Sequence, residues 1–480
     1  MPRATMPWSA FVALPLVLSC AVNPATGERE LALIGEGQEI QMRREYDPEI
    51  TASMGLVADT ALQGYVHGLG LRLAATTERP DLPWSFKVVD DPVVNAFAVP
   101  GGFIYVTRGI LANFESEAEL AAVLGHEIGH VTARHSVAQM SRQQLQQLGL
   151  GVGMILSEDV RKYADLLAVG LGILNLRYSR GDENQADELG VRYMGRAGYD
   201  PEAMVGVMQM LAQVSGSGDG RVPEWQLTHP YPENREAHIR SLIQGLPDTA
   251  TVDAGRDRYL DRIHGLVYGE NPREGYFKGP LFLHPDLAFQ IRFPQGWTMV
   301  NQKSAVGAVG PDEQALVVLK VAPDASDPAT ALRAYLSQEG VQGGQIRESR
   351  ADGQVRARAY FSATTSEGAA MRGEVLFVAY RGTLYRIQAL ASASAWDALA
   401  GAMSASLGSF APVTDPRVLG VRPWTLQVVR VPQETTFQQF YERNPMPLPL
   451  EEAARLNRRS PADVLPRGTR LKRVVGEPLP

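Results

Sequence analysis

The stretch His126-Glu127-Ile128-Gly129-His130 is the most informative part of this sequence. On an α-helix, residues at i and i+4 lie one turn apart on the same face. The two imidazoles can therefore reach a single Zn²⁺ at bond lengths of about 2.0–2.1 Å, and the carboxylate of Glu127 can address a water beside the metal. Histidine is scarce, with 8 in 480 residues, so a chance match to this pattern is uncommon.

The surrounding sequence predicts the helix that this arrangement needs. Ser116, followed three residues later by a glutamate, forms a capping-box pattern, and residues 120–131 carry apolar side chains at helical spacing without a proline. Two structural histidines in a core are the alternative, which is disfavoured because Glu127 would then be buried without a reason. His135 lies five residues after His130 and points away around the helix, so we expect a capping or supporting role for it.

A third ligand is predicted further along the chain, because a catalytic zinc usually has three protein ligands and one open position. Glu183 and Asp187 stand at i and i+4 in a second helical stretch, and Ala186 and Gly190 would let that helix approach another backbone closely. We predict Glu183 as the third ligand. Asp187 is expected to hydrogen-bond a ligand histidine or to face the substrate. A solvated acidic face is the alternative for this pair.

Three segments carry a resemblance to a known family. They are H-E-x-x-H at 126–130, S-R-x-x-E-x-x-A-D at 179–187 and the sequence NAFAVPGG at 95–102. Together they resemble the gluzincin metallopeptidases of the HtpX and CAAX-prenyl-protease family, and most closely their periplasmic, BepA-like branch. The resemblance extends over about residues 25–245 and implies a mostly helical peptidase domain with a small β-sheet.

The same resemblance assigns roles to individual residues. It implies that His126, His130 and Glu183 bind one zinc ion per chain and that Glu127 is the catalytic base. Asp187 matches a position with a proton-donor role in the family, and orientation of a ligand histidine is an equally good physical interpretation. The expected reaction is peptide-bond hydrolysis, in which Glu127 activates a zinc-bound water and returns the proton to the leaving amine.

Two further residues are candidates for stabilising the oxyanion of that reaction. They are His229, in a proline-bounded loop, and Arg235, which follows shortly after it. His229 could instead occupy the open position of the metal and hold the enzyme inactive, or it could be a loop histidine in solvent. Arg235 could instead be a structural partner of an acidic residue such as Glu233 or Asp187.

Residues 103–107 predict a β-strand next to the metal helix, because they are β-branched and aromatic and follow a Pro-Gly-Gly turn. As an edge strand it could bind an extended substrate backbone by strand addition. The expected substrates are therefore unfolded or misassembled envelope proteins, recognised with weak side-chain selectivity.

The first twenty residues predict a lipoprotein export signal. Arg3 is the only charge before the apolar run 11–18, which is too short to span a bilayer, and the run ends in a sequence that approximates a lipobox at Cys20. Cys20 is the only cysteine, so no intramolecular disulfide can form. Ordinary cleavage and release is the alternative, since Leu18 is not the usual small residue. By resemblance to bacterial lipoproteins, Ala21 favours a periplasmic location with a lipid anchor in the outer membrane.

Composition excludes some classes of protein. The formal net charge is −7, with 46 basic and 53 acidic residues and no basic run, so no nucleic-acid partner is expected. A hydrophobic content of 45% and a charged content of 21% are ordinary for a globular chain.

The chain is long enough for several domains, and we expect a multidomain α+β protein. The expected parts are a signal peptide (1–20), an N-terminal arm (21–55), the zinc metallopeptidase domain (56–248), a linker (249–278), an α+β module (279–410) and a LysM-like module (420–476). Within the peptidase domain, the apolar runs 148–156 and 166–174 are too short to cross a bilayer as helices. They predict a buried or lid-like helical hairpin, with a membrane-surface contact as the alternative.

Residues 420–476 predict the order strand, helix, helix, strand and resemble a LysM domain, a module that binds N-acetylglucosamine glycans such as peptidoglycan. Residues 432–435 depart from that family, which commonly has a glycine-aspartate-threonine turn there. Residues 417–480 contain 11 basic and 6 acidic residues, a formal charge of +5. That charge could favour an anionic envelope surface, and a solvated face is the alternative.

The leading hypothesis is a zinc-dependent metalloendopeptidase of the bacterial cell envelope. The alternative hypothesis is an envelope chaperone-like or glycan-binding factor whose metal site is self-inhibited or structural. Glycan hydrolysis is disfavoured, because zinc chemistry already explains the carboxylates near the motif.

Overall fold

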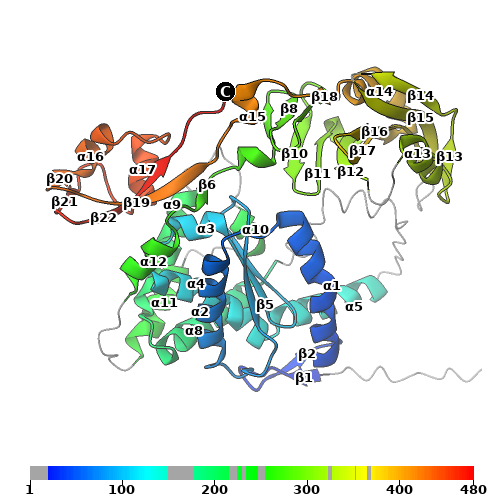
Figure 1. Cartoon of the computed structure of the whole chain (residues 1–480). Coiled ribbons are helices and arrows are strands. Elements are labelled where there is room, and N and C mark those ends of the chain that lie inside the picture. The colour runs from blue at the N-terminus through cyan, green and yellow to red at the C-terminus, as the bar shows by residue number, and fades with distance from the viewer. Residues whose placement is uncertain are drawn as a thin grey trace, which may run out of the picture.

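The computed structural model describes residues 20–149, 177–215, 224–229, 234–246, 254–322, 327–351, 353–364 and 369–480. Residues 1–19 of the predicted export signal, nearly all of the two apolar runs at 148–156 and 166–174, and Glu233 lie outside the described residues. Figure 1 shows a helical lower part and two smaller units above it. The described residues contain no helix with the length and apolar character needed to cross a membrane.

A small three-stranded sheet organises the lower part. β5 (Phe103–Thr107) lies in the middle, parallel to β3 (Ser85–Val89) and antiparallel to β4 (Ala96–Val99). α1 (Glu36–Met54) covers one face of the sheet, and α2 (Thr60–Ala74) packs on the other. The expectation that residues 103–107 form an edge strand is therefore wrong. The chain turns back after β4, and β5 then pairs with β4 on one side and with β3 on the other. β4 is therefore an edge strand, and it packs beside the metal helix.

α4 (Glu117–Thr132) is the central helix of the lower part. It starts where the Ser116 hydroxyl accepts a hydrogen bond from the Glu119 backbone N–H at 3.3 Å, as the sequence predicts. Every residue of α4 is buried, and the helix packs against α2, β4, α8 (Arg180–Arg196) and α9 (Glu202–Ser215). The remaining helices around it are α3 (Arg108–Asn113), α5 (His135–Gly149), α10 (Glu224–Thr228), α11 (Arg235–Gln244) and α12 (Arg256–Arg262).

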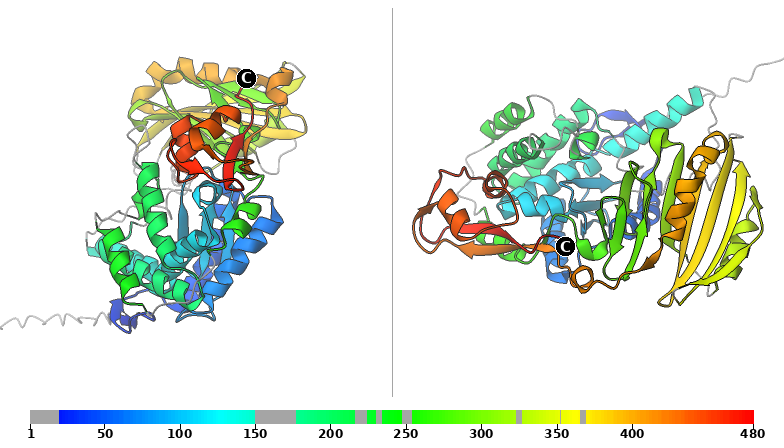
Figure 2. Two further views of the ribbon diagram at one scale, coloured as in Figure 1. Left: turned by 90° about the vertical axis from the view of Figure 1, so that its left-hand side faces the viewer. Right: turned by 90° about the horizontal axis from the view of Figure 1, so that it is seen from above.

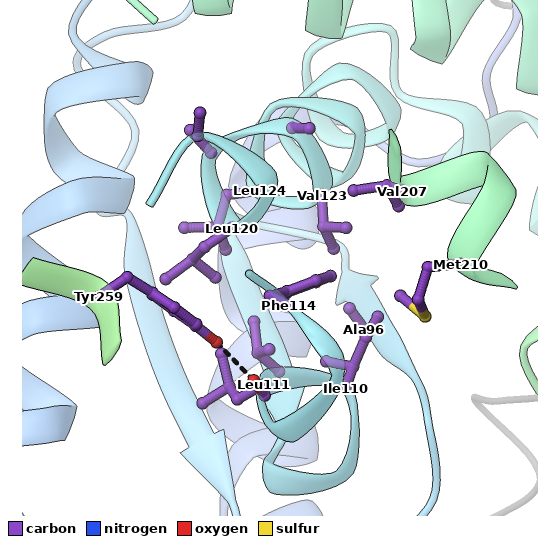
Figure 3. Packing of buried hydrophobic residues seen from close by; sticks show 14 of the residues in the cluster. Ala96, Ile110, Leu111, Phe114, Leu120, Val123, Leu124, Val207, Met210 and Tyr259 are labelled. Atoms are coloured by element: carbon purple, nitrogen blue, oxygen red, sulfur yellow. Dashed lines mark hydrogen bonds between the residues drawn. The ribbon is translucent and has the colours of Figure 1, made fainter. Parts of the chain in front are cut away.

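A hydrophobic core surrounds the first turns of α4 (Figure 3). Leu120 and Leu124 point towards Phe114, and the Tyr259 hydroxyl donates a hydrogen bond to the Leu111 carbonyl at 2.5 Å. At about 25 cal/mol per Å² of apolar surface removed from water, burial on this scale is the main source of stability for the domain. The N-terminal hairpin of β1 (Cys20–Val22) and β2 (Arg29–Leu31) lies at the opposite end of α4, where the Asn23 side chain donates to the Ala133 carbonyl at 3.2 Å.

The second unit is built on an eight-stranded antiparallel sheet. α14 (Ala393–Gly408) covers one face and α13 (Pro328–Leu336) the other. Figure 2 shows α14 in orange along the yellow strands, seen from above. The strand order is β10 (Thr298–Gln302), β11 (Ala305–Val309), β12 (Ala315–Val321), β17 (Thr383–Ser392), β16 (Ala370–Tyr380), β15 (Gln354–Thr364) and β13 (Val341–Gly343), with β14 (Arg347–Ala351) also paired to β15. A smaller sheet adjoins it, ordered β18 (Ala411–Pro412), β9 (Phe289–Arg292), β8 (Leu281–His284) and β7 (Tyr276–Lys278).

The third unit, which we call the C-terminal unit, comprises residues 424–475. It contains β19 (Trp424–Arg430), α16 (Phe437–Arg443), α17 (Leu450–Leu456) and β22 (Arg470–Val475), in the predicted order, with a short pair of β20 (Thr435–Thr436) and β21 (Val464–Leu465). β19 pairs with β22 and also with β6 (Val267–Tyr268), which follows α12. The hydrophobic core of this unit is continuous with the core around α4.

Candidate metal centre

The positions of the two helices that carry the predicted ligands depend on small residues. A Cβ atom on Gly129 would lie 3.0 Å from the Ala186 carbonyl oxygen, and one on Gly190 would lie 3.0 Å from the His126 backbone nitrogen. These distances leave little room for a side chain at either glycine, so the close contact of α4 with α8 depends on Gly129 and Gly190. The predicted close approach of the second helix is therefore confirmed, and it brings the two ligand-bearing faces together.

Ser179 begins α8 with a complete capping box. Its hydroxyl accepts a hydrogen bond from the Asp182 N–H at 3.1 Å, and the Asp182 carboxylate accepts one from the Ser179 N–H at 2.9 Å. This cap fixes the start of α8, so that Glu183 lies in the first turn of the helix. Glu183 and Asp187 then share one buried face, and both side chains are fully buried. The alternative of a solvated acidic face is wrong.

Four side chains converge at the contact between α4 and α8. Single ligand atoms of His126, His130, Glu183 and His229 all lie within 4.8 Å of one another. The Nε2 atoms of His126 and His130 are 3.0 Å apart, and they lie 3.6 Å and 3.4 Å from the Glu183 carboxylate oxygens. Tetrahedral coordination with bonds of about 2.1 Å places ligand atoms about 3.4 Å apart. These separations therefore suit a single Zn²⁺.

The ionisation of the site also suits a metal. Burial lowers the pKa of His130, which favours the neutral imidazole that metals bind. Burial would raise the pKa of Glu183, but the opposing charges of His229 and Arg235 outweigh it and hold that pKa well below the usual value. The site thus offers two imidazoles and a carboxylate, the ligand set of many catalytic zinc sites.

Glu127 lies beside this cluster and is 2% exposed. Its Oε1 is 3.6 Å from His229 Nε2, and its Oε2 is buried without a hydrogen-bond partner among the described residues. Burial raises the pKa of Glu127, although the nearby charge of His229 opposes the shift. A buried carboxyl with a raised pKa and an unused oxygen is suited to accepting a proton and giving it back.

Asp187 and Arg235 form a buried pair behind His126. Arg235 donates to Asp187 from Nε and from Nη2, at 2.7 Å each, and its Nη1 lies 2.9 Å from Glu183 Oε2. The other partner of Asp187 is His126, whose Nδ1 is 2.9 Å from Oδ1. Arg235 is therefore a partner of Asp187, as one of the predicted alternatives has it, and its role towards the oxyanion stays a prediction. The Asp187 carboxylate is placed to fix the orientation of His126.

His229 is not a solvent-exposed loop residue. It follows α10, is 5% exposed, and its Nδ1 lies 2.9 Å from Glu183 Oε1. Burial would lower the pKa of His229, but the carboxylates of Glu183 and Glu127 outweigh it and raise that pKa. A ring nitrogen of His229 lies within 4.8 Å of the ligand atoms of His126, His130 and Glu183, and the latch alternative stays a prediction.

Two neighbouring residues, His135 and Gln185, support the predicted ligand His130. His135 Nδ1 is 2.9 Å from His130 Nδ1, and its Nε2 is 2.7 Å from the Gln185 side-chain oxygen. The supporting role of His135 is thus confirmed, although the angular argument fails: α4 ends at Thr132 and the chain folds back through Arg134, at φ 58°. Sequence reasoning gave no role to Gln185, and no local pattern would have revealed it.

Tyr178 was also missed as a site residue. Its ring stacks on His130 with centroids 3.8 Å apart, its hydroxyl lies 2.9 Å from the Ser136 hydroxyl, and its N–H donates to the Thr228 carbonyl at 3.1 Å. Tyr178 thereby joins a ligand to the segment that carries His229. Its position directly before the Ser-Arg of the second motif was the only available signal.

An apolar pocket adjoins the cluster. It opens between β4, α4 and α9, and its lining includes Ala96, Val123, Met204, Met208 and Trp225 together with His126, Glu127 and His229. A substrate side chain entering this pocket would be adjacent to both Glu127 and the edge strand β4.

Comparison with known proteins agrees with this geometry. Residues 60–243 match the sequence profile of peptidase family M48. These residues are a peptidase family M48 domain. The M48 domain contains all of the metal-binding candidates, and the resemblance noted from the motifs is confirmed at the level of the family.

Named relatives cover the same part of the chain. The beta-barrel assembly-enhancing protease of Escherichia coli (strain K12) is 30% identical over 252 residues, 51% of each chain. The protein of the same name from Yersinia pestis is 33% identical over 242 residues, covering 48% of this chain and 49% of its own. The mitochondrial metalloendopeptidase OMA1 of Arabidopsis thaliana is 30% identical over 235 residues, covering 48% and 45%. The chain spans about half the length of these relatives.

Proposed function

We propose that this protein is a zinc-dependent metalloendopeptidase of the bacterial cell envelope that hydrolyses peptide bonds in unfolded or misassembled proteins. The observation that carries the proposal is the convergence of His126, His130 and Glu183, with Glu127 beside them, at the contact between α4 and α8. The names of the similar metalloendopeptidases and assembly-enhancing proteases support the reaction and the class of substrate.

The residues of the chain divide the chemistry between them. His126, His130 and Glu183 would hold the zinc, which supplies Lewis-acid polarisation of a peptide carbonyl and makes a water at the site more acidic. Glu127 accepts the proton of that water and returns it to the leaving amine. The raised pKa of Glu127 fits both steps, because burial favours the protonated carboxyl that gives the proton to the leaving amine. Asp187 keeps His126 in the orientation that the metal needs.

His229 serves as a latch in this proposal. It stands between Glu127 and Glu183, on the side where a water and the scissile carbonyl would have to lie. Substrate entry then requires His229 to move away from Glu183, after which its imidazole is free to donate a hydrogen bond to the developing oxyanion. The self-inhibited metal site of the alternative hypothesis is thus one state of the peptidase.

Substrate binding is proposed to use the edge strand β4. Its outer edge is unpaired within the described sheet, and the strand contacts α4. An extended peptide added there would run past His126 and Glu127, which line the same pocket as Ala96. Main-chain pairing of this kind requires an unfolded segment, which is consistent with unfolded or misassembled proteins as substrates.

Envelope attachment and glycan contact complete the proposal. A lipid at Cys20 would anchor the protein in the outer membrane from the periplasmic side, and the strand-helix-helix-strand order of the C-terminal unit supports its LysM-like interpretation. Membrane fractionation of a Cys20→Ser variant tests the lipid anchor. Co-sedimentation of the protein with purified peptidoglycan tests the glycan contact.

The central test is a comparison of wild-type protein with Glu127→Gln on casein and on an unfolded outer-membrane protein. We expect cleavage to fall by about 10²–10⁴-fold in the variant, since a general base contributes that much, and to stop on addition of o-phenanthroline. Glu188→Gln is the matched control, because Glu188 is exposed on α8. Equal cleavage by Glu127→Gln would contradict the proposed mechanism, and a full cellular role for that variant would favour a chaperone-like function.

A further inference from the structure

The C-terminal unit, at the upper left of Figure 1, contacts the M48 domain near the N-terminal end of the metal helix through Lys472 and Arg458. Lys472, on β22, is 0% exposed. Its Nζ donates to the carbonyl oxygens of Ala112 and Phe114, at 3.0 Å each, and lies 2.9 Å from Glu115 Oε1. The ammonium therefore satisfies carbonyls at the end of α3 and fixes the turn that leads into α4.

A second cation of the same unit reaches the first turn of α4. Arg458 donates from Nη1 to the Gly206 carbonyl at 2.7 Å, and its Nη2 lies 3.1 Å from Glu119 Oε2. The backbone of Arg458 has φ 52°, in the left-handed region that favours glycine. The side chain of this arginine bridges α9 and α4.

The two acidic partners are themselves connected. The Glu119 carboxylate accepts a hydrogen bond from the Glu115 N–H at 2.7 Å, and Arg256 Nη2 donates to Glu115 at 2.7 Å and to the Arg470 carbonyl at 3.1 Å. Glu115 and Glu119 therefore form one charged network with cations of the C-terminal unit and of α12. The positive charge of residues 417–480 is partly used inside the molecule rather than on a solvated face.

The helix that this network contacts, α4, is closely packed along the rest of its length. α4 is buried along its whole length, and its contact with α8 is limited by Gly125, Gly129 and Gly190. A rise of 1.5 Å per residue places His126 about 10 Å from Glu119 along the same rigid rod. A shift or rotation at the first turn must therefore also move His126 and His130 relative to Glu183, which is on the other helix.

We propose that Lys472 and Arg458 are positioning residues for the metal centre, and that the C-terminal unit is a structural part of the M48 active site. Through Glu115 and Glu119 the two cations set the axial position of α4, and with it the distance from the two histidines to Glu183. The kinetic part of this inference rests on the proposed peptidase function. The geometric part concerns only the metal-binding residues.

The test uses full-length protein loaded with Co²⁺ in place of zinc, whose visible absorption reports ligand geometry, together with kcat and KM for casein. The variants are Arg458→Met and Lys472→Met, with Lys472→Arg as the conservative replacement. Arg467→Met is the control, because Arg467 is an exposed arginine of the same unit. Hydrogen exchange of peptides from β19 and β22 establishes that the unit is still folded and docked.

We expect Arg458→Met and Lys472→Met to change the Co²⁺ spectrum and to lower kcat by about 10- to 100-fold with little change in KM, since a displacement near 1 Å has that effect. Lys472→Arg should keep much of the wild-type Co²⁺ spectrum and kcat, and Arg467→Met should have the spectrum and kcat of the wild type. Wild-type spectrum and kcat in Arg458→Met would overturn the proposal, even if Lys472→Met fails to fold. Absence of peptidase activity in the wild type would count against the proposed function alone, because the spectrum still tests the positioning.

Discussion

Among individual residues, Glu183 and Asp187 show how one buried face of a helix can serve two purposes. Both carboxylates are fully buried and both contact Arg235 and His126, yet only Glu183 points its oxygens at the Nε2 atoms of the two histidines. Asp187 instead faces the Nδ1 side of His126. The i and i+4 spacing therefore places one acid at the metal and the other behind a ligand.

Replacement of Asp187 by asparagine should weaken metal binding. The amide keeps the shape of the side chain but removes the charge that Arg235 contacts twice and replaces one acceptor with a donor. Loss of such a supporting contact typically costs 10–100-fold in metal affinity or activity, and we expect zinc retention against a chelator to fall within about this range. Burial would raise the pKa of Asp187, but Arg235 outweighs it and lowers that pKa, so the native group is charged at neutral pH.

The matched control for that experiment is Glu188→Gln, the next residue on α8, whose side chain is exposed. Zinc retention in the Asp187→Asn protein equal to that of the control would show that His126 is oriented by other contacts.

Among the elements, the contact of α4 with α8 determines whether a metal site exists. The two His ligands come from one helix and the carboxylate from the other, so their separation follows the distance between the two helix axes. That distance is limited by Gly129 and Gly190, where an added Cβ would lie 3.0 Å from a backbone atom of the facing helix.

A methyl group at Gly129 should therefore separate the helices. Its Cβ would lie 3.0 Å from the Ala186 carbonyl oxygen and 3.1 Å from its Cα, both backbone atoms that cannot swing aside. We expect Gly129→Ala to destabilise the fold by about 1–3 kcal/mol, as overpacking does, and to weaken zinc binding. Denaturant unfolding and zinc competition measure the two effects.

Gly195→Ala is the corresponding control on α8, because nothing lies within 4 Å of a Cβ at that position. It should stabilise the helix by up to about 1 kcal/mol, since alanine has the higher helix propensity, and leave zinc binding unchanged. A Gly129→Ala protein with the zinc affinity of the control would show that α4 and α8 can adjust without moving the ligands.

In the whole molecule, two parts that are far apart in the sequence lie together in space. The peptidase part and the C-terminal unit share one hydrophobic core, although the eight-stranded sheet with its own two clusters lies between them in sequence. β6 and β19 bring the two ends of this intervening segment together, because Tyr268 and Trp424 are paired directly in antiparallel register. The intervening residues therefore form an insertion between two paired strands.

This topology predicts that the insertion can be removed. A two-residue Asn-Gly turn in place of residues 269–423 would convert β6 and β19 into a hairpin, since this turn suits strands paired at that separation. We expect the shortened protein to fold and bind zinc, whereas removal of residues 424–480 should expose the shared core and give an unstable protein. Thermal unfolding and zinc content of the two deletions distinguish them. The opposite ranking would show that the larger sheet, and not the C-terminal unit, supports the M48 domain.

The sequence alone determined which side chains lie one turn apart on the same face of a helix and can therefore act together. His126, Glu127 and His130, and separately Glu183 and Asp187, are placed by the 3.6-residue period, and Ser116 marks the start of its helix, so these residues and the metal were predictable. The order strand, helix, helix, strand predicted for residues 420–476 was also found, because alternation, helical spacing and turns are local signals.

Only the tertiary structure decided which distant segments meet. It placed β5 in the middle of its sheet, His229 beside the three predicted ligands, Arg235 behind His126, and Lys472 at the turn before the metal helix. Each of these is a contact across tens to hundreds of residues. No periodicity records such contacts, because the energy that selects them comes from burying shared apolar surface and pairing buried charges after the local elements have formed.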